Sequence, residues 1–153
     1  MHPTVVSRYY DRLSLPSNPS VHYLHHPSGV TVLVCAESLP CEVVSVDFGN
    51  QKKKNGVDRG DQTRSEGGKK GALRLQPETR LCVLRLADGS ERVIRSGVRG
   101  FLAEVNNTLR EHPDLVRTAP ENQGYLAILT YAPGQRKPQE LGAAIQIRQP
   151  SLF

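Results

Sequence analysis

The chain has 153 residues, a formal net charge of +5 and three isolated cysteines, Cys35, Cys41 and Cys82. A chain of this length can bury one hydrophobic core without a disulfide framework, so the cysteines are expected to be reduced thiols of an intracellular protein. The longest apolar run, at 30–36, is far shorter than the ~20 residues that cross a bilayer, and the N-terminus lacks the pattern of a signal peptide, so we expect one soluble domain and no membrane partner.

The first half of the chain predicts short strands behind an N-terminal segment. Residues 5–13, "VVSRYYDRL", favour a short helix that the prolines of "LPSNPS" at 15–20 end. Residues 21–24 and 30–36 are typical of two strands joined by the turn "HHPSG". The β-branched stretch at 43–48 predicts a third strand.

A basic segment follows at 50–71, "NQKKKNGVDRGDQTRSEGGKKG", which contains one aliphatic residue, Val57. Such a composition buries too little apolar surface to offset its ordering entropy, so we expect a flexible insertion within the domain. Between Lys52 and Arg80 there are nine basic and four acidic residues. The surplus of five basic residues in this stretch equals the net charge of the whole chain.

The second half predicts a hairpin and two further strands. Leu81 to Leu86 alternate with period two, "ADGS" at 87–90 is a strong two-residue turn signal, and Glu91 to Arg95 form the returning strand. Residues 98–105 and 125–130 are typical of strands.

A short helix is predicted between these last two strands. Asn106 is a good N-cap for "NTLREH", and Pro113 ends the helix. So many short strands need their edges covered, which indicates a mainly β fold, closed or sandwiched. We divide the chain into an N-terminal segment (1–20), a β domain (21–131) with the flexible basic insertion (50–71), and a C-terminal tail (132–153).

Two resemblances to known families follow from these motifs. The stretch "GFLAEVNNTLREHPDLVRTAPENQGYLAIL" at 100–129 resembles the core of the glycine cleavage H-protein, a lipoyl carrier. This resemblance implies the barrel-sandwich hybrid fold of biotinyl and lipoyl domains. The motifs "SRYYDR", "LVCAESLP", "KKGA", "LADGSE", "VRGFLAEVN" and "GYLAI" together resemble the Abitram family of actin-binding transcription modulators. That resemblance implies actin binding, an influence on actin polymerisation, and a place in the nucleus as well as the cytoplasm.

A lipoyl or biotinyl carrier needs a lysine at the tip of an exposed hairpin, because the cofactor is joined to its amine. By its spacing from "VRGFLAEVN", the corresponding hairpin here has its tip at Ala87, Asp88, Gly89 and Ser90, which offer no amine. The lysines of the chain lie elsewhere, at Lys52, Lys53, Lys54, Lys69, Lys70 and Lys137. We therefore predict no cofactor and no carrier chemistry.

Other catalytic motifs are also missing from the sequence. His22, His25 and His26 flank a Pro-Gly turn without a nearby cysteine pair, so solvated hairpin residues explain them better than a metal site. There is no G-x-S-x-G elbow, and "GGKKG" lacks the spacing of a P-loop. The interpretation is a protein that is not an enzyme and holds no metal.

The basic segment has two interpretations. It is either a solvated insertion or an electrostatic binding site for an acidic partner such as actin. In the second interpretation the partner-binding residues are Lys52, Lys53, Lys54, Arg59, Arg64, Lys69 and Lys70. The lysine clusters could also serve as a weak bipartite nuclear import signal. No aromatic residue of this segment can stack on a base, which argues against nucleic acid as the partner.

The leading hypothesis is a non-catalytic actin-binding protein that modulates actin polymerisation and has a nuclear, transcription-related role with nuclear protein partners. Two alternatives remain open. One is an adaptor that docks onto lipoyl-handling enzymes without bearing the cofactor. The other is a basic nucleic-acid-binding module, which would show a steep salt dependence.

Overall fold

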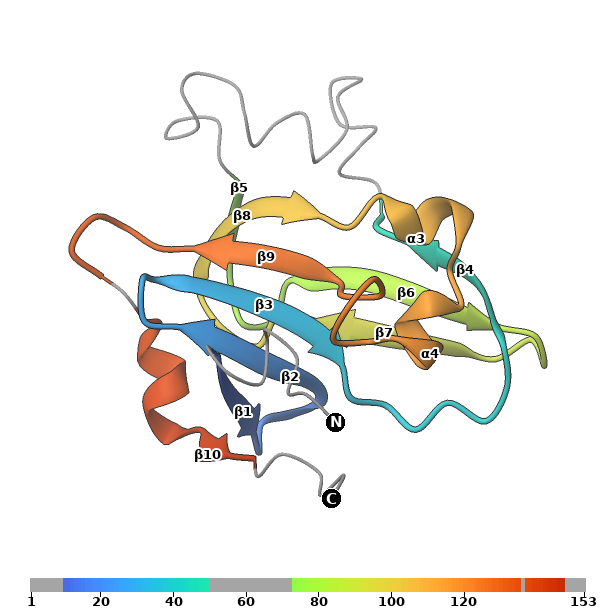
Figure 1. Cartoon of the computed structure of the whole chain (residues 1–153), viewed down its shortest axis with the longest axis horizontal. Coiled ribbons are helices and arrows are strands. Elements are labelled where there is room, and N and C mark those ends of the chain that lie inside the picture. Colours follow the sequence, from blue (N-terminus) through green and yellow to red (C-terminus); the bar gives the residue numbers. More distant parts are fainter. Residues whose placement is uncertain (1–9, 50–72, 136, 148–153) are drawn as a thin grey trace, which may run out of the picture.

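The computed structural model describes residues 10–49, 73–135 and 137–147. These residues form mainly β-strands, with two one-turn α-helices and one 3-10 helix (Figure 1). The mainly β class predicted from the sequence is therefore confirmed. No helix within these ranges is long and apolar enough to cross a membrane.

The strands form two antiparallel sheets. The larger sheet has the order β10-β1-β2-β3-β9-β8-β5, and the smaller sheet has the order β4-β6-β7. The strands of the larger sheet are β1 (Asp11–Leu15), β2 (Asn18–His26), β3 (Val30–Cys35), β5 (Leu73–Leu75), β8 (Gly100–Val105), β9 (Ala127–Thr130) and β10 (Ile145–Gln146). Those of the smaller sheet are β4 (Val43–Asp47), β6 (Arg80–Leu86) and β7 (Glu91–Arg95).

The two predicted hairpins are present. β2 and β3 pair from Val21 with Cys35 to His26 with Val30. β6 and β7 pair around the "ADGS" turn, where Gly89 adopts a φ of +90°. The second hairpin follows its sequence signal because Asp-Gly supplies the positive φ that a tight turn needs.

The N-terminal prediction was wrong where it can be checked, because Asp11–Leu15 is strand β1 and not the end of a helix. Leu13 and Leu15 are buried, while Ser14 between them is only half-buried, which is the period of a strand. β1 lies antiparallel to β2, with Leu13 opposite Tyr23. Pairing with a neighbouring strand therefore overrides the local helical preference.

Parts of both flanking segments join the larger sheet. β1 pairs with β10 through Leu13 opposite Gln146. The 3-10 helix η4 (Gln139–Ala143) precedes β10 and buries Leu141 in the core. The residues before 21 and after 131 therefore contribute to the same hydrophobic core as the central strands.

The two sheets enclose one apolar core, in which Leu33, Leu84, Leu102 and Leu129 are fully buried. Burial of such leucines is the main favourable term in the folding of a domain of this size. The sheets are also joined by a polar contact, described next.

Tyr23 of the larger sheet donates a hydrogen bond of 2.6 Å to the carbonyl of Ser96, just after β7. The amide of Asn18 donates to the Tyr23 hydroxyl at 2.8 Å. Burial raises the pKa of Tyr23 to about 12, so the hydroxyl stays protonated and keeps donating. Gly97 lies next to the Tyr23 hydroxyl and has a φ of +78°. A Cβ at this position would overlap that hydroxyl. A glycine is therefore required at this position.

The crossover from β8 to β9 contains two one-turn helices, α3 (Thr108–Glu111) and α4 (Leu115–Thr118). The side chain of Asn106, 5% exposed, organises this crossover. Its amide donates to the carbonyls of Gln123 at 2.6 Å and Tyr125 at 2.9 Å, and its oxygen accepts from the N–H of Thr108 at 3.1 Å. The predicted N-cap at Asn106 is wrong by one residue, because Asn107 occupies the N-cap position and its side chain makes no capping bond. Asn106 bonds the first helical N–H from one position earlier.

We expect Asn106→Ala to lower the free energy of unfolding by about 2–4 kcal/mol, because it leaves two carbonyls and one N–H of the crossover without their partner. Urea denaturation measures this change. The control is Asn107→Ala at the exposed neighbouring position, which should cost less than about 1 kcal/mol. Equal losses for the two variants would contradict the role given to Asn106.

We expect Gly97→Ala to lower the free energy of unfolding by about 2–5 kcal/mol, because strain at positive φ adds to overlap with Tyr23. Gly89→Ala is the matched control, since Gly89 also has a positive φ but has no atom within 4 Å of an added Cβ. Strain alone should cost that variant about 1–2 kcal/mol. Thermal unfolding of both variants separates the two contributions, and identical costs would rule out the overlap.

Candidate functional site

The predicted partner-binding residues lie outside the described part of the chain. This holds for all seven, Lys52, Lys53, Lys54, Arg59, Arg64, Lys69 and Lys70. Their role therefore remains a prediction. The candidate surfaces within the described residues are the tip of the β6–β7 hairpin and a groove beside β4.

The hairpin tip is an ordered tight turn that projects at the right-hand end of the view in Figure 1. The carboxylate of Asp88 accepts hydrogen bonds from the backbone N–H of Ser90 at 2.8 Å and from its hydroxyl at 2.6 Å. The bond from the Ser90 hydroxyl is the largest cause that holds the pKa of Asp88 below its usual range, and the bond from the Ser90 N–H lowers it further. Ala87, Asp88 and Gly89 are exposed. The tip thus presents a carboxylate and a hydroxyl, and neither can form the amide link of a lipoyl or biotinyl group.

Two of the three histidines of β2 make separate hydrogen bonds to hydroxyl groups. His25 is buried and its Nδ1 lies 2.9 Å from the hydroxyl of Thr31, while Nδ1 of His26 lies 2.7 Å from the hydroxyl of Ser28. Burial lowers the pKa of His22 and of His25, which favours the neutral ring. Within the ranges that the structure describes, no group of three His, Cys, Asp or Glu side chains could hold a metal ion.

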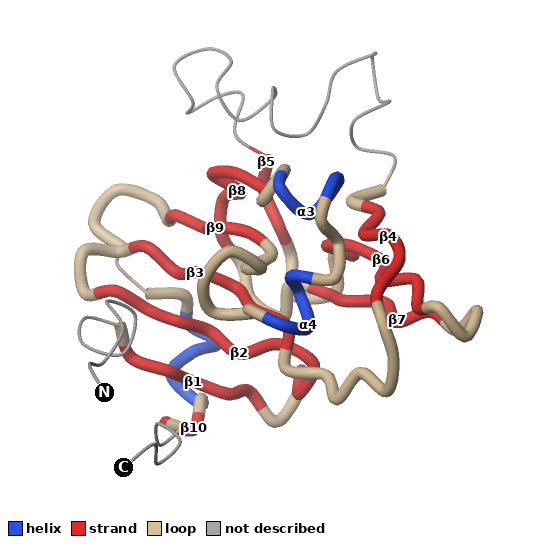
Figure 2. The backbone as a smooth tube through the Cα atoms, turned by 45° about the vertical axis from the view of Figure 1, so that its right-hand side comes forward, coloured by secondary structure: helices blue, strands red, loops and turns tan. Residues whose placement is uncertain are grey.

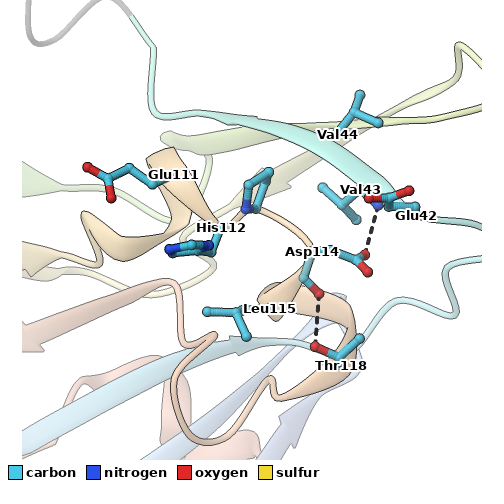
Figure 3. A pocket seen from close by; sticks show the side chains of 9 residues that line it. Glu42, Val43, Val44, Glu111, His112, Asp114, Leu115 and Thr118 are labelled. Carbon is cyan, nitrogen blue, oxygen red and sulfur yellow. Dashed lines mark hydrogen bonds between the residues drawn. The ribbon is translucent and has the colours of Figure 1, made fainter.

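The groove lies between β4 and the helical crossover and has a volume of about 430 Å³. Figure 3 shows Glu42, Val43 and Val44 on one wall, facing the segment from Glu111 to Thr118 on the other. Figure 2 shows α3 beside β4 at this end of the molecule. The groove is therefore built by segments far apart in the sequence.

Asp114 fixes the distance between the two walls. Its carboxylate accepts a hydrogen bond of 2.9 Å from the backbone N–H of Val43, which is dashed in Figure 3. The same carboxylate is held by Arg117 at 2.8 and 2.6 Å. The hydrogen bond from Arg117 is the largest cause that lowers the pKa of Asp114, and the bond from Val43 lowers it further. The ionised carboxylate ties α4 to β4.

The lining of the groove combines apolar and acidic side chains. Val44 is 51% exposed, and Leu115 is half-buried on the opposite wall. Three carboxylates line the groove, those of Glu42, Glu111 and Asp114, and no lysine or arginine of the described residues does. A second hollow of about 540 Å³ shares His112 and Leu115 with the groove, so the corner between α3 and α4 stands between two depressions. This geometry suits binding of an extended segment or a side chain.

Sequence reasoning missed the groove. The outward position of Val44 follows from the predicted strand at 43–48, because Val43 faces the core and side chains alternate. Asp114 directly after Pro113 was a second signal, since such a pair often begins a helix. Nothing in the sequence indicates that these residues meet.

Comparisons with known proteins give both a fold and a family. No model of a protein family matches the chain. It is 50% identical over 141 residues to the Caenorhabditis elegans protein named uncharacterized protein F54F2.7, covering 92% of this chain and 89% of that one. It is 33% identical to Protein Abitram of Drosophila melanogaster, covering 84% of this chain and 60% of that protein. It is 30% identical to Protein Abitram of Danio rerio, covering 83% of this chain and 76% of that protein.

Among solved structures, the chain is similar to a glycine cleavage system H protein from Mycobacterium marinum, with a TM-score of 0.58. The likeness covers 89% of this chain and 90% of that one at 13% identity, so it shows the fold alone. The predicted barrel-sandwich hybrid is thereby confirmed, with two sheets that do not close into a barrel. The sequence identities to Protein Abitram of Danio rerio and of Drosophila melanogaster also show the family. This chain belongs to the Abitram family.

Proposed function

We propose that the chain is a non-catalytic, actin-binding protein that modulates actin polymerisation, with a role in the nucleus as well as the cytoplasm. The observation that carries this proposal is the hairpin tip. A fold of the H-protein type presents at Ala87 to Ser90 an ordered turn without an amine. Such a fold keeps its shape but lacks the attachment point for a swinging arm, which leaves its surface for binding.

The distribution of charge supports an acidic partner. The described residues contain ten basic and twelve acidic side chains, whereas residues 50–72 contain seven basic and three acidic ones. The basic surplus therefore belongs to the segment with the seven predicted partner-binding residues and not to the β-sheets. Actin has an acidic surface, and membership of the Abitram family supports actin as that partner.

The nuclear part of the proposal is supported by the same segment. Lys52 to Lys54 and Lys69 to Lys70 form two basic clusters with the character of a weak bipartite import signal. Nuclear proteins are further proposed partners. The cofactor-less adaptor is the second candidate function, and the lysine-free tip on a carrier fold favours it.

We expect the wild-type chain to co-sediment with actin filaments, and we expect reversal of five lysines to glutamate to weaken this binding. The variant changes Lys52, Lys53, Lys54, Lys69 and Lys70. The dissociation constant should rise by about tenfold or more, since each exposed ion pair contributes about 0.2–1 kcal/mol. Binding should also weaken as salt rises, because exposed charges are screened beyond ~8 Å at physiological ionic strength.

The matched control replaces the same five lysines with arginine, which keeps the charge and should keep the binding. Unchanged sedimentation of the glutamate variant would remove the basic segment from the mechanism. No sedimentation of the wild-type chain would remove actin. Steeply salt-dependent retention on DNA by a chain that does not sediment would favour the nucleic-acid alternative.

A further inference from the structure

The groove beside β4 lies at an open edge of the smaller sheet. β4 is the outer strand of the order β4-β6-β7, and no described strand pairs with its other side. Unpaired strand edges are templates onto which an extended peptide can add. Most proteins cover such an edge, so an edge that borders a groove invites a partner.

The backbone at Val43 faces this groove. Its N–H points away from β6, because it donates to the carboxylate of Asp114. The N–H and C=O of one strand residue point to the same side, so the Val43 carbonyl also lies on the open edge. That carbonyl can accept a hydrogen bond from the main chain of an added segment.

The side chains of the groove define what kind of segment fits. Val44 is one of three large hydrophobic residues that the described part of the chain exposes, and it lines the groove together with Pro113 and Leu115. An aliphatic side chain of a partner can be buried against this apolar part of the lining. The volume of about 430 Å³ falls within the range of about 300–1,000 Å³ that is usual for binding sites.

The charges of the groove define the second requirement. Asp114 is paired with Arg117, which also lies within electrostatic range of Glu42. Glu42 and Glu111 are exposed, and neither forms an ion pair with another described residue. Acidic groups in a concave site favour a cationic partner through the local field.

From this geometry we propose that the groove between β4 and the α3–α4 crossover binds a short extended peptide of a partner protein that carries a lysine or arginine next to an aliphatic residue. The aliphatic side chain packs on the apolar part of the lining, which includes Val44 and Leu115, and the cation lies near Glu42 or Glu111, which stand at opposite ends of the groove (Figure 3). The peptide main chain donates one hydrogen bond to the Val43 carbonyl, because the Val43 N–H is already bound to Asp114. The proposal uses none of the residues of the basic segment and does not depend on actin binding.

The test is a selection of short random peptides, displayed on phage, against the full-length chain and two charge variants. The site variant carries Glu42→Lys and Glu111→Lys. The matched control carries Glu78→Lys and Glu91→Lys, two exposed positions away from the groove with the same change in net charge. Wild type and control should enrich peptides with a basic residue next to an aliphatic one, and the site variant should lose that enrichment.

A synthetic copy of the enriched peptide is then titrated into the isotope-labelled chain and followed by NMR. The amide signals of Val44 and Leu115 should shift, and the dissociation constant should be about tenfold or more weaker for the site variant, because like charges then face each other. A peptide with glutamate in place of its basic residues should recover binding to the site variant. That exchange of specificity is not expected from a merely structural role of the two glutamates.

Several outcomes would overturn the proposal. Enrichment without basic residues, equal enrichment by the site variant, or shifts confined to residues away from the groove would each do so. A mass that doubles with concentration in light scattering, and does so for the wild type but not the site variant, would assign the groove to a second copy of the chain. If no peptide is enriched, and charge reversal of Lys52 to Lys54 shifts the amide signals of Val44 and Leu115, the groove would be assigned to the chain's own basic segment.

Discussion

The hydrogen bonds of the Asn106 side chain are the constraint on which the functional end of the molecule depends. One buried amide satisfies two carbonyls of the turn before β9 and one N–H at the start of α3. Neither α3 nor α4 is longer than one turn, so neither is stable by its own backbone bonds. Their position comes from Asn106 at one end and from Asp114, bound to Val43 of β4, at the other. The wall of the groove is therefore as fixed as the strands that it joins, although it is made of short turns.

The same architecture separates the features that a carrier protein would combine. The hairpin tip is ordered by Asp88 and Ser90 but has no amine, so this exposed turn offers no side chain for the amide link of a lipoyl group. The acidic groove and the basic segment have opposite charge, and the described fold itself carries a slight acidic excess. Opposite charges suit two different partners. The two proposals together describe a protein that brings an acidic filament surface and a basic peptide together.

The sequence was informative where the structural signal is local and failed where it is not. The β6–β7 hairpin was predictable because alternation at Cys82, Leu84 and Leu86 and the Asp-Gly turn are both contained within a few residues. Asp11 to Leu13 were mistaken for the end of a helix because their strand character depends on pairing with β2. Asn106 was predicted as the N-cap, which is Asn107, and its bonds to Gln123 and Tyr125 could not be predicted. The groove was invisible because Val43 and Asp114 are 71 positions apart and meet only in the folded chain.

The central claim is that a fold of the H-protein type, without its attachment lysine, binds actin through the basic segment. Carbodiimide crosslinking tests this most directly, because the reagent joins a lysine amine to a carboxylate only where the two are in contact. The chain is mixed with filamentous actin, and the crosslinked peptides are identified by mass spectrometry. The account predicts links from Lys52 to Lys54 and from Lys69 or Lys70 to aspartates or glutamates of actin. Links from Lys137 alone, or none from these five lysines while the two proteins sediment together, would contradict it.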